Sequence, residues 1–465
     1  MKRDQSRLIL IFIVFAAFFF AVIAKLFYWQ IVKADSLRLA GRAQSTLSLV
    51  TTAKRGDVLF SDGFPIATNK NSYLLYANPK KVDSVESYSR ILSPVLEADP
   101  ASLSARLNQD LFWVSLKSRL SWEQKVQIEN MKLPALGFEL QTEREYPEAS
   151  MAAHLIGFVG KNQDGLDQGY FGLEGYYDRQ LRGRPGSTYL IKDALGNPIL
   201  TDVREDKKID GRTIITSIDR SVQYLADTKL KAGIEKYQAD GATIIVMETK
   251  TGKILASSSY PKFGPAKYWE YDGKYYTNPV VSHLYEPGST FKVLVMAAGI
   301  DSGLVKPETK CPICSGPLPV DGYEIKTWNG KYYPNNTMTQ VIQHSDNTGM
   351  VFVGQKLGVK RFVDYLERFG IGNLTGIDIQ GEVYEPLRLV KKWKNIDLAT
   401  ASFGQGISVT PIQLITAVNS IANGGKLMKP MVVEKINTPE GKTIVLEPQQ
   451  VGQPISYATA KVMTW

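Results

Sequence analysis

Ser289 and Lys292 are the two residues of this sequence best suited to nucleophilic chemistry. They lie three positions apart in the segment Ser289 to Ala298, which has a helical pattern and follows the turn Tyr285-Glu286-Pro287-Gly288. Residues i and i+3 share a helix face, so the Lys292 amine can reach the Ser289 hydroxyl. A lysine whose pKa is lowered by burial or cationic neighbours can take the serine proton, and helix-terminal N–H groups favour an oxyanion. The pair predicts a serine acyl-transfer site.

The S-x-x-K spacing is not specific on its own, because about two matches are expected by chance in a chain of this composition. A second match, Ser259-Tyr260-Pro261-Lys262, ends a predicted strand and runs into a Gly-Pro dipeptide at 264–265. No helix would hold that lysine over that serine. The local context therefore favours Ser289 as the nucleophile.

The triplet Ser345-Asp346-Asn347 supplies polar groups that would complete such a site. It lies in a turn-prone position between the helical stretch Met338 to Gln343 and the next one. The Ser345 hydroxyl is suited to relay a proton between Lys292 and a leaving amine, and the Asn347 amide is suited to hold both the lysine and a substrate carbonyl. The alternative role of this triplet is to cap a helix.

Several further motifs accompany this constellation. They are Arg55-Gly56-Asp57 with Asp62-Gly63, Arg144-Glu145-Tyr146-Pro147, Gly172-Leu173-Glu174-Gly175 with Leu181-Arg182-Gly183, Ile218-Asp219 with Gln223, Ser259-Tyr260-Pro261, and Gly404-Gln405-Gly406 with Thr410-Pro411 and Gln413. Together with S-x-x-K followed by S-D-N, they give a chain that resembles class B penicillin-binding proteins of the elongation and division machineries, from its apolar N-terminal segment to its last residue.

The resemblance implies an α+β fold in three parts. These are an N-terminal transmembrane helix, an elongated pedestal domain of the dimerisation type, and a transpeptidase domain like those of penicillin-binding proteins and serine β-lactamases, with an antiparallel sheet and helices. The resemblance also implies a peptidoglycan D,D-transpeptidase that cross-links stem peptides through a Ser289 acyl-enzyme, with Lys292 as base, Ser345 as proton relay and Asn347 as positioning group. β-Lactams would acylate the same serine. The family uses no metal or organic cofactor, and a membrane-embedded glycan polymerase is the expected partner.

The sequence departs from the family pattern at the third motif. The family carries Lys-Thr-Gly on a strand after the other two motifs, and no such triplet follows Asn347. Lys250-Thr251-Gly252 precedes Ser289 and occupies a predicted hairpin turn. Because the sequence ends at Trp465 inside an apparent helix begun near Ser456, we expect the natural chain to continue and this transpeptidase domain to be incomplete. Such a form would lack one oxyanion-hole donor, worth roughly 10²–10³ in rate, and is expected to be inactive.

The apolar run from Leu8 to Ala24, extended by Leu26 to Trp29, predicts a membrane anchor. Its length approaches the ~20 residues of a spanning helix. Lys2, Arg3 and Arg7 precede it, so the positive-inside rule places residues 1–7 in the cytoplasm and everything after residue 30 outside. A cleaved signal peptide is the alternative, but the length of the run and its aromatic end favour an anchor at 8–29.

Two folded domains are expected after the anchor, a pedestal domain at 30–210 and a transpeptidase domain at 211–465. The expected elements of the pedestal include helices at Val82 to Leu96 and Trp122 to Met131. Those of the transpeptidase domain include a strand at Thr213 to Ile218, a helix capped by Asp219, and a hairpin of Ala242 to Met247 with Ile254 to Ser258.

Composition, net charge and cysteine spacing limit the partners and the kind of cysteine site that this chain can have. A chain of 465 residues with 44% hydrophobic and 22% charged residues is globular. Its net charge of +9 is spread along the sequence, and an exported protein meets little nucleic acid, so lipid head groups or wall polymers are the expected electrostatic partners. Cys311 and Cys314 are the only cysteines, and in an oxidising compartment their spacing favours a local disulfide over a zinc site.

Three other functions are compatible with the sequence. His344 adjoins Ser345 and His283 lies near Ser289, which leaves a Ser-His hydrolase open, although no nucleophile elbow is recognisable. A non-catalytic scaffold that activates the polymerase is a second alternative. A β-lactam sensor is the third, and the single N-terminal anchor disfavours it. The sequence does not distinguish elongation, division and sporulation.

Overall fold

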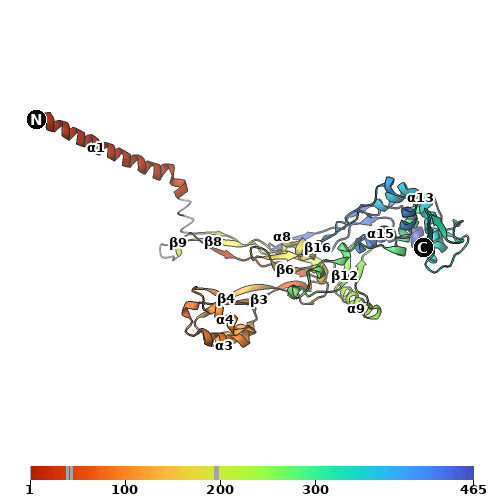
Figure 1. Cartoon of the computed structure of the whole chain (residues 1–465), viewed down its shortest axis with the longest axis horizontal. Helices are drawn as coiled ribbons and strands as arrows, with labels where there is room; N and C mark the ends of the chain where they lie inside the picture. Colours follow the sequence, from red (N-terminus) through yellow and green to blue (C-terminus); the bar gives the residue numbers. More distant parts are fainter. Residues whose placement is uncertain (1, 38–40, 42–45, 193–197) are drawn as a thin grey trace. The chain divides into compact units, whose positions relative to one another are not determined.

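The computed structural model describes residues 2–37, 41, 46–192 and 198–465 (Figure 1). The chain folds into two compact units, of which one comprises Met1–Ala53 and Arg184–Asp210 and the other Lys54–Gly183 and Gly211–Trp465. Both units mix helices with strands, in agreement with the predicted α+β class. The domain boundaries expected at residues 7, 29 and 210 remain predictions.

The first unit contains an apolar helix and a small sheet. Helix α1 (Lys2–Phe27) continues into a π-helical turn, η1 (Tyr28–Val32). The stretch from Arg7 to Val32 is strongly apolar and not buried, so this helix is long and apolar enough to cross a membrane. The sheet is antiparallel, in the order β1 (Thr46–Thr51), β8 (Gly186–Lys192), β9 (Pro198–Asp206).

A larger sheet in the second unit joins strands that are distant in the sequence. Its order is β17-β16-β10-β2-β3-β4, and β5 also pairs with β3. The strands are β2 (Val58–Leu59), β3 (Pro65–Ala77), β4 (Val114–Leu120), β5 (Leu136–Glu145), β10 (Thr213–Thr216), β16 (Val433–Asn437) and β17 (Thr443–Val445). Strand β10 runs parallel to β2, with Ile214 opposite Val58. One sheet therefore contains strands from both sides of residue 211.

Three helices pack beside β3 and β4. They are α3 (Val85–Leu96), α4 (Pro100–Leu107) and α5 (Trp122–Asn130). Their shared core includes Leu75, Leu92 and Leu120, which are inaccessible to solvent. Helices α3 and α5 confirm the helices predicted in this region, and side-chain caps from Ser84 and Ser121 start them at the observed residues.

A buried ion network connects three of the motifs that the sequence carries. Glu174 is fully buried and binds Arg55 Nε through Oε2 (2.7 Å) and Arg144 Nε through Oε1 (2.7 Å), while Arg55 Nη1 binds Asp178 Oδ1 (2.8 Å). Burial alone would raise the pKa of Glu174, but the two guanidinium groups outweigh it and lower that pKa. Arg55 precedes β2 and Arg144 lies near the end of β5, whereas Glu174 lies in α7 (Gly172–Tyr176) and Asp178 begins α8 (Asp178–Leu181). The short elements before α7 are α6 (Ala153–Ile156), β6 (Phe158–Lys161) and β7 (Asp167–Tyr170).

Residues after 211 supply the elements around the predicted nucleophile. Asp219 caps α9 (Arg220–Tyr237) by accepting from Ser221 N (2.9 Å) and Val222 N (3.0 Å), as predicted. Helix α9 packs on an antiparallel hairpin of β11 (Ala242–Met247) and β12 (Ile254–Tyr260), which confirms the predicted hairpin. The remaining α-helices and strands of the described chain are α10 (Pro279–Ser282), α11 (Lys292–Asp301), β13 (Leu318–Val320), β14 (Tyr323–Ile325), α12 (Met338–Gln343), α13 (Asn347–Arg368), α14 (Asn395–Ala401), α15 (Pro411–Ala422), β15 (Leu427–Met428), β18 (Gln450–Gly452) and α16 (Tyr457–Thr464).

Helix α11 lies at the centre of the largest hydrophobic core. It packs against α13, α15 and α16, and most of its residues are buried. Gly299 lets α11 and α13 approach closely, because a Cβ at this position would lie 2.7 Å from Val353 Cγ1. The first residue of this helix, Lys292, is therefore fixed at the edge of a rigid core.

Candidate active site

Lys292 is buried at the start of α11 and binds two residues of the S-D-N triplet. Its Nζ donates to Ser345 O (2.7 Å), Ser345 Oγ (3.0 Å) and Asn347 Oδ1 (2.8 Å). The Lys292 residue is only 2% exposed. Three acceptors match the three protons of an ammonium group, so the amine is held in one place. The structure thus brings Lys292 together with Ser345 and Asn347, which lie 53 and 55 positions later in the sequence.

The environment of Lys292 changes its proton affinity. Burial disfavours the charged ammonium and lowers its pKa to about 8, while the nearby Asp346 carboxylate acts in the opposite direction. A pKa of about 8 leaves roughly a tenth of the amine neutral at pH 7. A neutral amine can accept a proton, which is what the predicted chemistry requires.

Ser289 lies in a 3₁₀ turn (Gly288–Phe291) that leads directly into α11. Its side chain is exposed, whereas Lys292 is buried one turn later. The predicted helix therefore begins as a 3₁₀ turn and becomes α-helical at Lys292. Among the hydrogen bonds of the residues that the structure describes, none joins the Ser289 hydroxyl to the Lys292 amine. The nucleophile–base contact remains a prediction.

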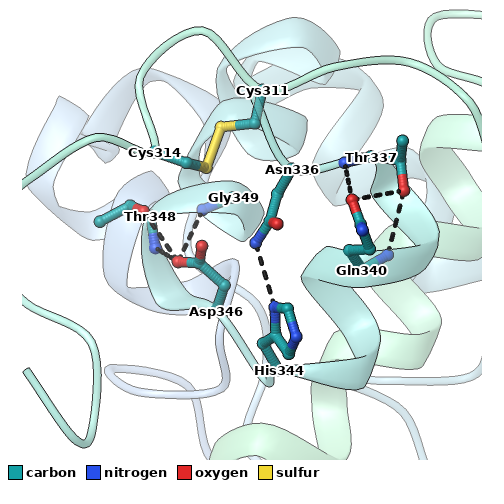
Figure 2. The surroundings of a disulfide bond; sticks show 9 residues. All are labelled: Cys311, Cys314, Asn336, Thr337, Gln340, His344, Asp346, Thr348 and Gly349. Carbon is teal, nitrogen blue, oxygen red and sulfur yellow. Dashed lines mark hydrogen bonds between the residues drawn. A yellow bond between two sulfur atoms is a disulfide. The ribbon is translucent and has the colours of Figure 1, made fainter. Parts of the chain in front are cut away.

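The S-D-N triplet combines the two roles considered for it. Asp346 caps α13 by accepting from Thr348 N (2.9 Å), Thr348 Oγ1 (2.8 Å) and Gly349 N (3.2 Å) (Figure 2). Ser345 has a φ of 53°, a left-handed conformation that turns the chain into this cap. The flanking residues Ser345 and Asn347 are then free to bind Lys292.

The loop after β14 forms hydrogen bonds with Asn347 of the triplet and with the adjacent His344. Asn347 Nδ2 donates to Lys326 O (2.8 Å), and the exposed Trp328 donates from Nε1 to His344 O (3.4 Å). Sequence reasoning did not identify these contacts, because a backbone carbonyl acceptor leaves no residue signature. These two hydrogen bonds can be found only from the three-dimensional structure.

Neither histidine near the site contacts a serine through a hydrogen bond in the described part of the chain. The His344 ring stacks on Tyr333 (4.1 Å between centroids), and its Nδ1 lies 3.3 Å from Asn336 Nδ2 (Figure 2). His283 stacks on Tyr285 (6.4 Å). Both histidine rings thus stack on tyrosines, and the structure gives no support to a Ser-His pair.

Cys311 and Cys314 form a disulfide with an S–S distance of 2.06 Å. Both cysteines are fully buried, and Cys311 N donates to Asn336 O (2.8 Å). Figure 2 shows the disulfide close to the capped end of α13. Within the described ranges no group of three His, Cys, Asp or Glu side chains gathers as metal ligands would.

The two rejected motif matches have ordinary structural roles. Ser259 is buried in β12, and Lys262 pairs with Asp227 (2.8 Å). Thr251 and Gly252 form the turn between β11 and β12, where Gly252 has a φ of 78°. The hairpin turn predicted for Lys250-Thr251-Gly252 is confirmed.

Two family models match the chain. Residues 242–464 match the penicillin binding protein transpeptidase domain, and residues 50–216 match the penicillin-binding protein dimerisation domain. Stage V sporulation protein D of Bacillus subtilis is 31% identical over 465 residues, covering 98% of this chain and 71% of that protein. The chain belongs to the class B penicillin-binding proteins.

Other penicillin-binding proteins show the same relationship. The peptidoglycan D,D-transpeptidase FtsI of Escherichia coli is 26% identical over 425 residues, covering 90% of this chain and 71% of that protein. Penicillin Binding Protein 2X from Streptococcus thermophilus superposes with a TM-score of 0.73 at 25% identity, over 90% of this chain and 65% of that one. The chain thus spans between 65% and 71% of the length of these three proteins. All four predicted site residues of this penicillin-binding protein lie inside the transpeptidase match.

Proposed function

We propose that this penicillin-binding protein is a serine D,D-transpeptidase of peptidoglycan synthesis, with Ser289 as its nucleophile. The observation that carries the proposal is the buried amine of Lys292, held by Ser345 and Asn347 one helical turn from the exposed Ser289. The transpeptidase match and the relatives named as peptidoglycan D,D-transpeptidases support it.

The acylation half-reaction follows from this arrangement. Ser289 Oγ attacks the carbonyl carbon of the penultimate D-alanine of a stem peptide, and its proton passes to the neutral Lys292 amine. As the peptide C–N bond breaks, that proton moves through the Ser345 hydroxyl to the leaving nitrogen, and free D-alanine departs. Ser345 Oγ lies 3.0 Å from Lys292 Nζ, a distance that permits this relay. An ester of Ser289 remains.

Cross-linking reverses the same steps with a different amine. The amine of a neighbouring stem peptide attacks the ester carbonyl and loses a proton through Ser345 to Lys292. The C–N bond of the cross-link forms, the ester C–O bond breaks, and Ser289 regains its proton. Asn347 Oδ1 holds the Lys292 amine (2.8 Å) throughout, and the Asn347 N–H that does not bind Lys326 O donates to the substrate. A β-lactam enters by the first half-reaction, since its ring amide takes the place of the scissile peptide.

The N-terminal helix gives this site its location. We propose that residues 8–29 anchor the protein in the cell membrane, that residues 1–7 are cytoplasmic, and that both the pedestal domain (30–210) and the transpeptidase domain (211–465) face the cell exterior. The length and hydropathy of α1 support this arrangement. The proposed partner of the pedestal is a membrane-embedded glycan polymerase that makes the strands to be cross-linked.

Covalent labelling with a fluorescent penicillin tests the assignment of the nucleophile. Membranes that carry the protein expressed from its natural gene should yield a labelled band, and Ser289→Ala should abolish it. Ser259→Ala is the matched control, because Ser259 belongs to the other S-x-x-K match and its hydroxyl lacks a hydrogen-bond partner within the described residues. Labelling that persists in Ser289→Ala would refute the assignment.

Cell growth separates an enzyme from a scaffold. If catalysis is the function, cells whose only copy is Ser289→Ala should fail to cross-link newly made peptidoglycan at the stage that this protein serves. Normal growth and cross-linking of those cells, with the variant present at wild-type levels, would instead favour a scaffold role.

A further inference from the structure

The turn that precedes Ser289 is paired with a segment more than a hundred residues later in the chain. Tyr285 N donates to Val409 O (3.0 Å) and Val409 N donates to Tyr285 O (3.0 Å). Gly288 N donates to Gly404 O (2.9 Å). These contacts advance in opposite directions along the two segments, so residues 285–288 and 404–409 run antiparallel. The second segment contains the Gly404-Gln405-Gly406 motif, to which the acyl-transfer chemistry assigns no role.

Contact between the two glycines is close enough to exclude any side chain. Gly404 has a φ of 83°, and a Cβ at this position would lie 2.1 Å from Gly288 O. Gly288 itself has a φ of 56°. A residue other than glycine at 404 would therefore be strained and would push away the peptide group directly before Ser289.

Glu286 ties the two segments together between these backbone pairs. Its Oε1 accepts a hydrogen bond from Gly406 N (2.7 Å). Hydrogen bonds to a carboxylate are stronger than those between neutral groups. The Glu286 side chain is exposed, so it can be replaced without disturbing the core. Three successive attachments at 285, 286 and 288 thus hold the turn before the nucleophile.

The segment 404–409 is itself fixed at both ends. Gln405 N donates to Thr400 O (3.0 Å) at the end of α14. Thr410, which is fully buried, caps α15 by accepting from Gln413 N, and Thr410 N donates to Gln413 Oε1 (2.9 Å). A segment fastened to two helices can serve as a rigid support for the turn that it contacts.

We propose that Glu286 and Gly404 are positioning residues that set the place of Ser289 relative to Lys292. This inference rests on the proposed function. Lys292 is held by Ser345 and Asn347 at the start of α13, whereas the turn before Ser289 is held by a different segment, residues 404–409 between α14 and α15. Loss of the contacts between this turn and residues 404–409 therefore moves Ser289 and leaves Lys292 in place. A misplacement of about 1 Å can cost ~10²-fold in rate.

The glycine contact is tested by the time course of acylation with a fluorescent penicillin at several concentrations, which separates the affinity of the initial complex from the rate constant of acylation. Gly404→Ala should lower that rate constant about 10²-fold with little change in affinity. The matched control is Gly441→Ala, because Gly441 has a φ of 84° and no heavy atom within 4 Å of the added Cβ. The control should acylate like the wild type. Equal rate constants for the two variants would overturn the role of Gly404.

Glu286 provides a second test that does not disturb the core. Glu286→Ala should lower the acylation rate constant about tenfold without changing the thermal unfolding midpoint, and Glu286→Gln should restore most of the rate because its amide oxygen can accept the Gly406 N–H. Wild-type rates in Glu286→Ala, or an equal loss in both variants, would overturn the inference. If Gly404→Ala does not fold, the comparison of Glu286→Ala with Glu286→Gln tests the inference on its own. Persistent labelling of Ser289→Ala would instead refute the proposed function, so the two failures are distinguishable.

Discussion

Asp346 lies between the two residues that bind Lys292, and its carboxylate opposes the effect of burial on that amine. Burial lowers the pKa of Lys292 to about 8, and Asp346 acts to raise it. The same carboxylate caps α13 through Thr348 and Gly349, while its second oxygen is buried without a hydrogen-bond partner in the described part of the chain. One side chain therefore both fixes the local backbone and sets the charge near the base.

Acylation is expected to depend on the neutral form of Lys292. Below pH 8 the rate constant for penicillin acylation should rise about tenfold per pH unit and then level off, because the neutral amine is the base. Asp346→Asn should move this inflection to lower pH, since the amide keeps the cap but removes the negative charge that favours the ammonium. Rate measurements between pH 5.5 and about 9.5 would reveal the shift. An unchanged inflection in a folded variant would contradict this account.

Removing the Asn347 side chain should slow acylation while the fold persists. Asn347→Ala deletes the acceptor that binds Lys292 (2.8 Å) and the donor that binds Lys326 O (2.8 Å), so the base loses part of its support. The expected loss is about 10²-fold in the acylation rate constant. Asn329→Ala is a suitable control, because the Asn329 side chain is exposed and, among the hydrogen bonds of the described residues, it takes part only in one accepted from Lys331 N in the same loop. Similar rates in the two variants would argue against the role of Asn347.

The buried carboxylate of Glu174 should be costly to replace. Glu174→Gln leaves Arg55 and Arg144 buried without their shared anion, and breaking such a network costs about 3–5 kcal/mol of unfolding free energy. Because the pKa of Glu174 is lowered from the usual 4.5, its contribution is complete above pH 4.5 and is lost as the pH falls through the lowered value. Urea unfolding at pH 7 and in mild acid measures both effects. Glu235→Gln, which breaks an exposed pair with Lys231, should change stability by less than about 1 kcal/mol.

Two helical glycines should respond oppositely to alanine. Gly299→Ala places a Cβ 2.7 Å from Val353 Cγ1, and this overpacking should cost about 1–3 kcal/mol. Gly233 in α9 has no atom within 4 Å of an added Cβ, so Gly233→Ala should stabilise the protein by about 0.5–1 kcal/mol through helix propensity. Thermal unfolding of both variants, and partial recovery in Gly299→Ala combined with Val353→Ala, would check the assignment. Destabilisation of Gly233→Ala as large as that of Gly299→Ala would contradict it.

Local patterns in the sequence predicted the elements that local physics determines. Asp219 as a cap, the helix at Met338–Gln343 and the β11–β12 hairpin all depend on residues close in sequence, and all are found. The grouping of Lys292 with Ser345 and Asn347 was predicted from motifs, and it is observed as hydrogen bonds. The predicted contact of Ser289 with Lys292 is not among them.

Contacts made through the backbone were not predictable in the same way. Lys326 binds Asn347 through a carbonyl oxygen, which any residue type would provide. Gly404 is visible as a glycine in the sequence, but its contact with Gly288 depends on how α14 and α15 place the intervening segment. The pairing of β2 with β10 likewise joins residues about 150 positions apart, beyond the reach of periodicity arguments.

The parallel alignment of β10 with β2 has a consequence for exchanging modules between relatives. A chimaera spliced near residue 211 would join a β2 edge from one parent to β10 and β16 from the other, so those hydrogen-bonding edges would have to match in register and twist. A functional hybrid must therefore inherit residues 54–59 and 213–216 from one source, together with Val433–Asn437. The segment to exchange is therefore the whole sheet, although its strands come from three separate parts of the sequence, β2 to β5, β10, and β16 with β17.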